Sequence, residues 1–148
     1  MTSPELVRSL SARKMGLPPL ANVISVTFGA QLVMAIILHI TTSKAWNKAA
    51  AEGIYRTDTL PMEGFIHCST RDQVIQVANI RFRGQAGLIL LFIDTDKVTR
   101  DIIYENLEGG QQMFPHIYGE LNIDAVVQVA EFEPAADGDF DLPHSDIQ

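Results

Sequence analysis

The sequence predicts a small α+β domain, because its strands and helices do not alternate regularly along the chain. Two nearly uninterrupted apolar runs, residues 35–41 and 88–93, are typical of buried strands. Apolar residues at helical spacing predict helices at about 42–52 and 71–82. After residue 94 several strands follow without a helix of normal length between them. This order argues against a parallel sheet with alternating helices.

The composition divides the chain into three parts. Residues 1–33 place three basic residues before an uncharged stretch that prolines and polar residues interrupt, so we expect neither a membrane anchor nor an export signal there. We predict an N-terminal extension, either disordered or an over-long start, followed by a single domain over residues 34–133. Residues 134–148 are acidic and aperiodic, and they predict a disordered tail.

Polar and glycine residues delimit the two predicted helices. Thr42 or Ser43 is expected to cap the first helix, and Gly53 to end it. A strand over residues 65–68 precedes the second helix, and Ser69 or Thr70 is expected to cap that helix. A free helix N-terminus at the end of a strand is a common site for an anion.

The second half of the chain is predicted to be mostly strand. The run at residues 88–93 contains no polar residue, so we expect it to be the central strand of the sheet. Residues 101–106 and 124–132 alternate in the manner of strands. Between them, residues 107–112 contain two glycines and predict a flexible loop that acts as a lid over residues 114–119.

The charge distribution limits the class of partner. The net charge is −7, and residues 101–148 contain eleven acidic residues but no lysine or arginine. Nucleic-acid binding is therefore not expected, because phosphate neutralisation requires a basic surface. A local basic patch at Arg71, Arg81 and Arg83 has a simpler explanation as a solvated helix face.

The single cysteine, Cys68, excludes an internal disulfide and a multi-cysteine zinc site. A reducing, cytoplasmic location fits this cysteine usage. Cys68 follows His67 directly, but adjacent strand residues point to opposite faces, so His67 is not placed to act as its base. A buried structural cysteine is the favoured interpretation over a nucleophile.

Three of the four histidines lie in segments that combine apolar and polar residues. These segments are Leu38–Thr41, Glu63–Ser69 and Phe114–Gly119. We expect them to form one pocket. The absence of H-x-H, H-x₃-H and HExxH spacings predicts no metal site, although three histidines from separate strands leave a metal-dependent enzyme as an alternative.

Taken together, these three segments resemble an uncharacterised bacterial family called domain of unknown function 952, over about residues 36–134. That family is similar in fold to the ADP-ribosyltransferase superfamily, which includes NAD-dependent RNA 2′-phosphotransferases. The resemblance implies a small split β-sheet core with two helices and a cleft shaped like an NAD site. It also implies that His39 hydrogen-bonds the adenosine ribose.

The predicted site follows from this ligand class. Cleavage of the nicotinamide–ribose bond passes through an oxocarbenium-like cation and requires a carboxylate nearby. Glu105 is the first candidate for it and Glu120 the second. The predicted catalytic residues are Glu105, His116 and His67. The predicted residues for NAD or an ADP-ribose-like ligand are His39, Thr41, Ser69, Tyr118 and Gly119, with Ser69 at the pyrophosphate and Tyr118 stacked on the nicotinamide.

Two function classes besides an NAD-dependent transferase or glycohydrolase remain open from the sequence. One is a non-catalytic module that binds a small ligand or a protein. The other is the metal-dependent enzyme that uses the three histidines. The sequence leaves the oligomeric state undetermined.

Overall fold

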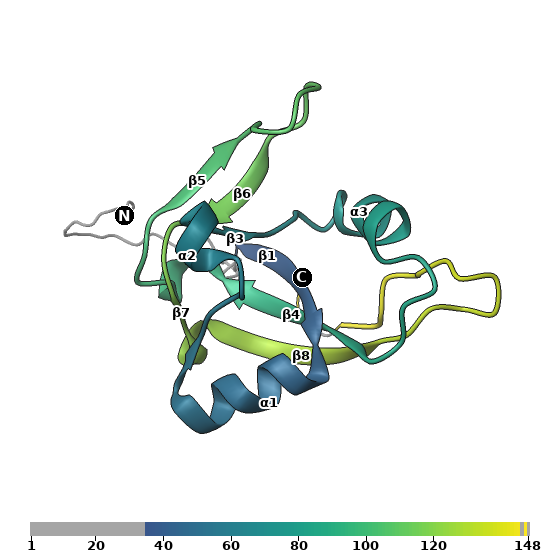
Figure 1. The fold of residues 1–148 in the computed structure, drawn as a ribbon, viewed down its shortest axis with the longest axis horizontal. Helices are drawn as coiled ribbons and strands as arrows, with labels where there is room; N and C mark the ends of the chain where they lie inside the picture. Colours follow the sequence, from purple (N-terminus) through teal and green to yellow (C-terminus); the bar gives the residue numbers. More distant parts are fainter. Residues whose placement is uncertain (1–34, 146, 148) are drawn as a thin grey trace, which may run out of the picture. The chain divides into compact units, whose positions relative to one another are not determined.

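The computed structural model describes residues 35–145 and residue 147 (Figure 1). The predicted extension, residues 1–33, lies outside the described part of the chain. No helix in that part is long and apolar enough to cross a membrane. The elements in chain order are β1 (Ile36–Thr42), α1 (Ser43–Glu52), β2 (Ile54–Tyr55), α2 (Leu60–Glu63), β3 (Ile66–His67), α3 (Val74–Arg81), β4 (Leu88–Asp94), η1 (Thr95–Lys97), β5 (Ile102–Glu105), β6 (Phe114–Ile117), β7 (Leu121–Asn122), η2 (Ile123–Ala125) and β8 (Val126–Phe132).

The core is built on an antiparallel sheet with strand order β1-β4-β8. All seven residues of β4 are buried, which confirms the prediction that residues 88–93 form the central strand. A strand that is covered on both faces and paired on both edges favours apolar side chains throughout, and here the one polar residue, Asp94, stands at the end of the strand. Figure 1 shows β4 lying between β1 and β8.

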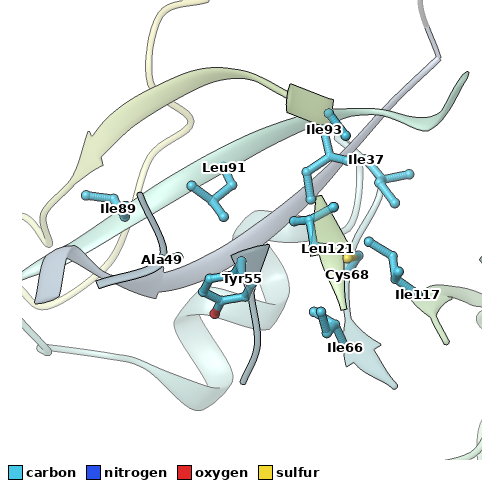
Figure 2. Packing of buried hydrophobic residues seen from close by; sticks show 11 residues of the cluster. Ile37, Ala49, Tyr55, Ile66, Cys68, Ile89, Leu91, Ile93, Ile117 and Leu121 are labelled. Atoms are coloured by element: carbon cyan, nitrogen blue, oxygen red, sulfur yellow. The ribbon is translucent and has the colours of Figure 1, made fainter. Parts of the chain in front are cut away.

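The two faces of this sheet are covered by different elements. On one face, Ile37 and Leu91 pack with Ala49 of α1 and with residues of the shorter strands, in the cluster shown in Figure 2. On the other face, Leu38 and Phe92 pack with residues of α3. Since successive strand residues point to opposite faces, the two clusters alternate along β1 and β4.

Two smaller antiparallel sheets complete the fold. β2 pairs with β7, and a second three-stranded sheet has the order β3-β6-β5. Leu38 and Ser69 exchange two backbone hydrogen bonds of 2.8 Å, which join β1 to the chain that follows β3. The structure is therefore a small α+β fold with several antiparallel sheets and few helices, as the sequence predicts at this level.

The first helix begins and ends where the sequence predicts, and the second does not. The Thr42 side chain accepts from the backbone N–H of Ala45, and Gly53 ends α1 with a φ of 85°. The helix predicted at 71–82 starts instead at Val74. Ser69 is held in the bridge to β1 and Thr70 N–H donates to the side chain of Gln73, so neither residue caps α3.

The residues after 133 differ from the predicted disordered tail. Phe140 is 1% exposed and stacks on Phe132, with ring centroids 4.7 Å apart. Its backbone N–H donates to the Asn79 side chain of α3 at 2.7 Å. The composition of this segment, which is acidic and contains glycine and proline, does not indicate this packing. A single buried aromatic residue attaches the short segment to the core.

Candidate functional site

A cavity of about 210 Å³ lies beside the bridge between Leu38 and Ser69. Its walls come from β1, from the chain at 67–69, from α3 and from the β5–β6 loop, residues 106–113. The lining includes His39, His67, Ser69, Arg81 and Glu108. All three histidine segments that the sequence singles out therefore reach one hollow, the third through Phe114, and the histidines that line it are His39 and His67.

A second hollow of about 240 Å³ also has His39 in its wall. It includes Thr41 and Tyr55, and it shares four lining residues with the first: His39, Ile40, Thr57 and Phe82. Ligand sites usually occupy about 300–1,000 Å³, so either hollow alone is small for a drug-sized molecule. Together they form one groove that passes His39, which we call the histidine groove.

Both ring nitrogens of His39 are engaged by the protein itself. Nδ1 lies 2.6 Å from the backbone oxygen of His67, and Nε2 lies 2.8 Å from the hydroxyl of Tyr55. That hydroxyl is also 2.8 Å from the Thr41 hydroxyl. The three side chains are 2–8% exposed, so the hydrogen bonds are largely shielded from water. The sequence resemblance predicts that His39 hydrogen-bonds a ribose, but both nitrogens of its ring already have partners within the protein.

The proton positions in this series of hydrogen bonds follow from the backbone carbonyl group of His67. Burial lowers the pKa of His39 to about 4, so its ring is neutral at pH 7. A carbonyl only accepts, so the ring proton is on Nδ1 and Nε2 is an acceptor for the Tyr55 hydroxyl. The Tyr55 hydroxyl has one proton, so the Thr41 hydroxyl donates to the Tyr55 oxygen. The lone pairs of Thr41 are left for a group in the groove.

Ser69 is a buried polar residue whose hydroxyl has no hydrogen-bond partner among the described residues. It is 5% exposed and lines the cavity, while its backbone N–H donates to Leu38. The backbone N–H groups of Ser69 and Thr70 are both used within the protein, so the Ser69 side chain is what this residue offers to a ligand. A buried hydroxyl without a protein partner marks a place for a polar ligand atom or a water.

Cys68 has the properties of a structural residue. It is 4% exposed and lies among Ile66, Ile117 and Leu121 in the core cluster (Figure 2). Burial raises the pKa of its thiol far above the ordinary range. The thiolate needed for nucleophilic attack is therefore strongly disfavoured.

The polar residues of the third histidine segment, His116 and Tyr118, belong to a separate cluster. His116 is 1% exposed, and its Nδ1 lies 2.8 Å from Oε2 of Glu105. The hydroxyl of Tyr118 donates to the same oxygen. These two hydrogen bonds, that of Tyr118 first, lower the pKa of Glu105, so its carboxylate is ionised at neutral pH. We call Glu105, His116 and Tyr118 the carboxylate cluster.

His67 connects the carboxylate cluster to the histidine groove. It pairs with His116 across β3 and β6, and the two rings lie 5.2 Å apart in an edge-to-face arrangement. Its ring also reaches the carboxylates of Glu63, at 3.3 Å, and Glu108, at 3.9 Å. The side chain is 43% exposed and lines the cavity. The predicted single pocket is thus a groove with an adjoining cluster, and His67 in the groove wall contacts His116 of the cluster.

Two remaining predicted positions do not line the groove, although one of them, Glu120, bonds to Arg56 in the wall of the second hollow. Gly119 has a φ of 140°, and a Cβ there would meet the side chain of Arg100 at 2.9 Å. Glu120, the second candidate carboxylate, pairs with Arg56 at 2.6 Å and with Arg100 at 3.5 Å. Neither is among the lining residues of the two hollows.

The polar residues of the groove that were not among the predicted site residues include Tyr55, Arg81 and Glu108. Tyr55 is in a two-residue strand, where alternation gives no signal. Arg81 and Glu108 stand in a helix and a loop as ordinary surface charges. Only the pairing of α3 with the β5–β6 loop brings them together.

The metal-dependent alternative finds no support in this geometry. His39 offers no free ring nitrogen, and Nδ1 of His116 is bonded to Glu105. Within residues 35–145 and 147, no group of three or more His, Cys, Asp or Glu residues is arranged to hold a metal ion.

Comparison with known proteins gives the family. The model of the family described as "Protein of unknown function (DUF952)" matches residues 40–129. The X-ray structure of protein CC0527 from Caulobacter crescentus is 33% identical, over 72% of this chain and 93% of that chain, with a TM-score of 0.65. The solution NMR structure of CC0527 is 34% identical, over 72% and 91%, with a TM-score of 0.63.

A search of curated proteins found no match. The family match spans more than half of the chain. It includes the second and third histidine segments in full and the first from Ile40 onward, without Leu38 and His39. The likeness to CC0527 covers sequence and fold together. The chain therefore belongs to the DUF952 family, as the resemblance of its histidine segments predicts.

Proposed function

We propose that the histidine groove binds NAD or an ADP-ribose-like ligand. The observation that carries the proposal is the Ser69 hydroxyl, which is buried in the groove wall without a partner among the described residues. The ligand class comes from the fold similarity between DUF952 proteins and ADP-ribosyltransferases that the sequence resemblance implies. Thr41 offers a second hydroxyl in the second hollow of the groove. The hydroxyl groups of Ser69 and Thr41 can hydrogen-bond the sugar hydroxyls of such a ligand, and the neutral His39 ring forms part of the wall of both hollows.

The length of the groove supports a ligand with two parts. The two hollows that His39 lines are similar in volume, about 210 and 240 Å³. A dinucleotide is too large for one of them. We place one ribose near Ser69 and His67 and the other end of the ligand near Thr41 and Tyr55. The Tyr55 hydrogen bond holds the His39 ring in the wall that both hollows share.

Thermal-shift titration of the full chain with NAD, ADP-ribose and nicotinamide tests this proposal. A ligand that binds only the folded state raises Tm as its concentration passes Kd. The Ser69→Ala variant is expected to fold normally and to bind about three- to tenfold more weakly, which is the loss of one hydrogen bond. The matched control is Ser43→Ala, on the exposed surface of α1. No shift with NAD or ADP-ribose at millimolar concentration would contradict the proposal.

A second function, ADP-ribosyl transfer or NAD hydrolysis, is favoured by the carboxylate cluster. Glu105 is ionised, and Tyr118 and His116 both bond to its Oε2, so Oε1 has no hydrogen-bond partner among the described residues. A carboxylate held in this way stabilises a developing positive charge. In the reaction the bond from ribose C1′ to the nicotinamide nitrogen breaks, and its electron pair leaves with nicotinamide. The acceptor hydroxyl or water then bonds to C1′ and releases its proton.

The Glu105→Gln variant separates catalysis from binding. A transferase or hydrolase is expected to lose nicotinamide release while its affinity for NAD stays within about threefold, because the change acts mainly on the transition state. Glu131→Gln is the matched control, since Glu131 is an exposed strand glutamate of β8 that lines neither hollow. Saturable binding of NAD without nicotinamide release in the wild-type chain would identify a non-catalytic binding module.

A further inference from the structure

An ion pair closes one side of the first hollow of the groove. Nη2 of Arg81, in the last turn of α3, lies 2.6 Å from Oε1 of Glu108 in the β5–β6 loop. Both residues line the cavity that contains Ser69. We propose that Arg81 binds the phosphate group of the ligand, and that Glu108 is the carboxylate which this phosphate displaces. The proposal rests on the proposed function, of which it specifies the phosphate subsite.

The chemistry of the pair suits an exchange of anions. Arginine presents its donors in a planar fork that matches carboxylate and phosphate oxygens alike. The two side chains are 55% and 41% exposed, so water screens their attraction and the pair separates readily. A pyrophosphate carries more charge and more acceptor oxygens than one carboxylate, and it therefore competes well for the same guanidinium.

The surroundings of Arg81 give the anion a defined position. Ser69 contributes the hydroxyl without a partner among the described residues, and His67 lines the same cavity with its Nδ1 3.9 Å from Oε2 of Glu108. Among the described residues that line this hollow, Glu108 is the only acidic one. When the Glu108 carboxylate moves out of the hollow, the polar side chains of Arg81, Ser69 and His67 remain. These side chains can donate hydrogen bonds to an anion, and no carboxylate is left among the lining residues.

The β5–β6 loop is attached to α3 at a second place, so release of Glu108 does not detach the whole loop. The Gln73 side chain donates to the backbone oxygen of Met113 at 2.8 Å. Gln112 and Gln76 make a side-chain contact of 3.3 Å. Gly109 and Gly110, both at positive φ, lie between Glu108 and this attachment. Displacement of Glu108 is therefore confined to the first half of the loop.

A matched control lies two residues along the chain. Arg83 is also 55% exposed and also pairs with a carboxylate, that of Asp139, but it does not line the cavity. The two arginines differ in their position relative to the groove, and Arg83 also donates to the backbone oxygen of Asp137 at 2.8 Å. Substituting each by glutamine removes one positive charge and one surface ion pair in both cases.

Calorimetric titration of the full-length wild-type chain and of Arg81→Gln, Arg83→Gln and Glu108→Gln, with ADP-ribose and with inorganic pyrophosphate, tests the proposal. We expect Kd for both probes to rise about tenfold in Arg81→Gln, the usual effect of losing a charge-assisted hydrogen bond, and to stay at the wild-type value in Arg83→Gln. Glu108→Gln should bind both probes more tightly, because the competing anion is gone. A purely structural ion pair would weaken binding in both Arg81→Gln and Glu108→Gln.

The outcomes for this proposal and for the proposed function are distinct. Equal binding of ADP-ribose by the wild type and Arg81→Gln overturns the phosphate subsite and leaves NAD binding intact. Pyrophosphate binding that depends on Arg81, without any binding of ADP-ribose or NAD, supports the subsite and overturns the proposed ligand. Binding of none of the three probes by the wild type overturns both.

Discussion

The hydroxyl of Tyr55 and Nε2 of His39 lie 2.8 Å apart, and both residues are buried. The opposite nitrogen of the same ring is 2.6 Å from the backbone oxygen of His67. His39 therefore joins three strands, β1, β2 and β3, through hydrogen bonds that are largely shielded from water. The ring shapes the groove wall because its own partners fix it there.

Removal of the Tyr55 hydroxyl is expected to destabilise the protein. In Tyr55→Phe the Nε2 acceptor stays buried without a donor, which costs about 1–3 kcal/mol of unfolding free energy. Urea denaturation measures this change. Tyr104→Phe is the control, since Tyr104 is 48% exposed and no described residue bonds to its hydroxyl. Equal stability of Tyr55→Phe and the wild type would show that the hydrogen bond is not formed in solution.

The neutral His39 ring predicts a loss of stability in mild acid. Burial lowers its pKa from 6.5 to about 4 in the folded protein, so between these values the unfolded chain binds the extra proton. Above pH 6.5 the His39 ring is neutral in both states and does not lower the unfolding free energy. Between pH 6.5 and pH 4 the unfolding free energy should fall by roughly 3 kcal/mol because of this group.

Urea titrations of the wild type and His39→Gln between pH 4 and 7 isolate this contribution. Other groups titrate in both proteins, so the difference in unfolding free energy between the two reports on His39. This difference should shrink as the pH falls. A difference that is constant over the range would mean that His39 is accessible to protons in the folded state.

The buried thiol of Cys68 is expected to react slowly. In the native protein a thiol reagent such as DTNB should modify it at least a hundredfold more slowly than in urea, since both burial and the raised pKa suppress the thiolate. The absorbance of released thionitrobenzoate gives both rates. Native reactivity equal to that of the unfolded chain would identify Cys68 as an accessible, activated thiol.

The packing of the last residues predicts a large effect of one aromatic side chain. Phe140→Ala should lower the unfolding free energy by about 3–5 kcal/mol, the usual cost of emptying a buried phenylalanine site. Leu142→Ala, at a position that is 39% exposed, should change it by less than about 0.5 kcal/mol. Comparable stability of both variants and the wild type would support the disordered tail that the sequence predicts.

Hydrophobic pattern and local capping chemistry determine much of the framework from the sequence. The apolar run in β4 is buried on both faces, and Thr42 and Gly53 delimit α1 through contacts within one or two turns. The histidine segments likewise identify the DUF952 family. Each of these features depends on residues that are close together in the sequence, so the sequence alone reports them.

Long-range contacts decided the start of α3 and the packing of residues after 133. Ser69 pairs with Leu38, 31 positions earlier in the chain, and this pairing removes it from the helix cap. Phe140 is buried because Phe132 and Asn79 offer it a ring and an acceptor. Local propensity carries no information about such partners.

The sequence by itself determined an α+β chain with three histidine segments and an apolar central strand, since periodicity and residue type are local properties. Only the tertiary structure decided how those histidines are used. It gave both nitrogens of His39 to Tyr55 and the His67 carbonyl, bonded His116 to Glu105, and set Arg81 against Glu108 at the groove. The physical reason is that a hydrogen bond or an ion pair depends on distances of about 3 Å, and separate strands, helices and loops reach such distances only when the core packs them together.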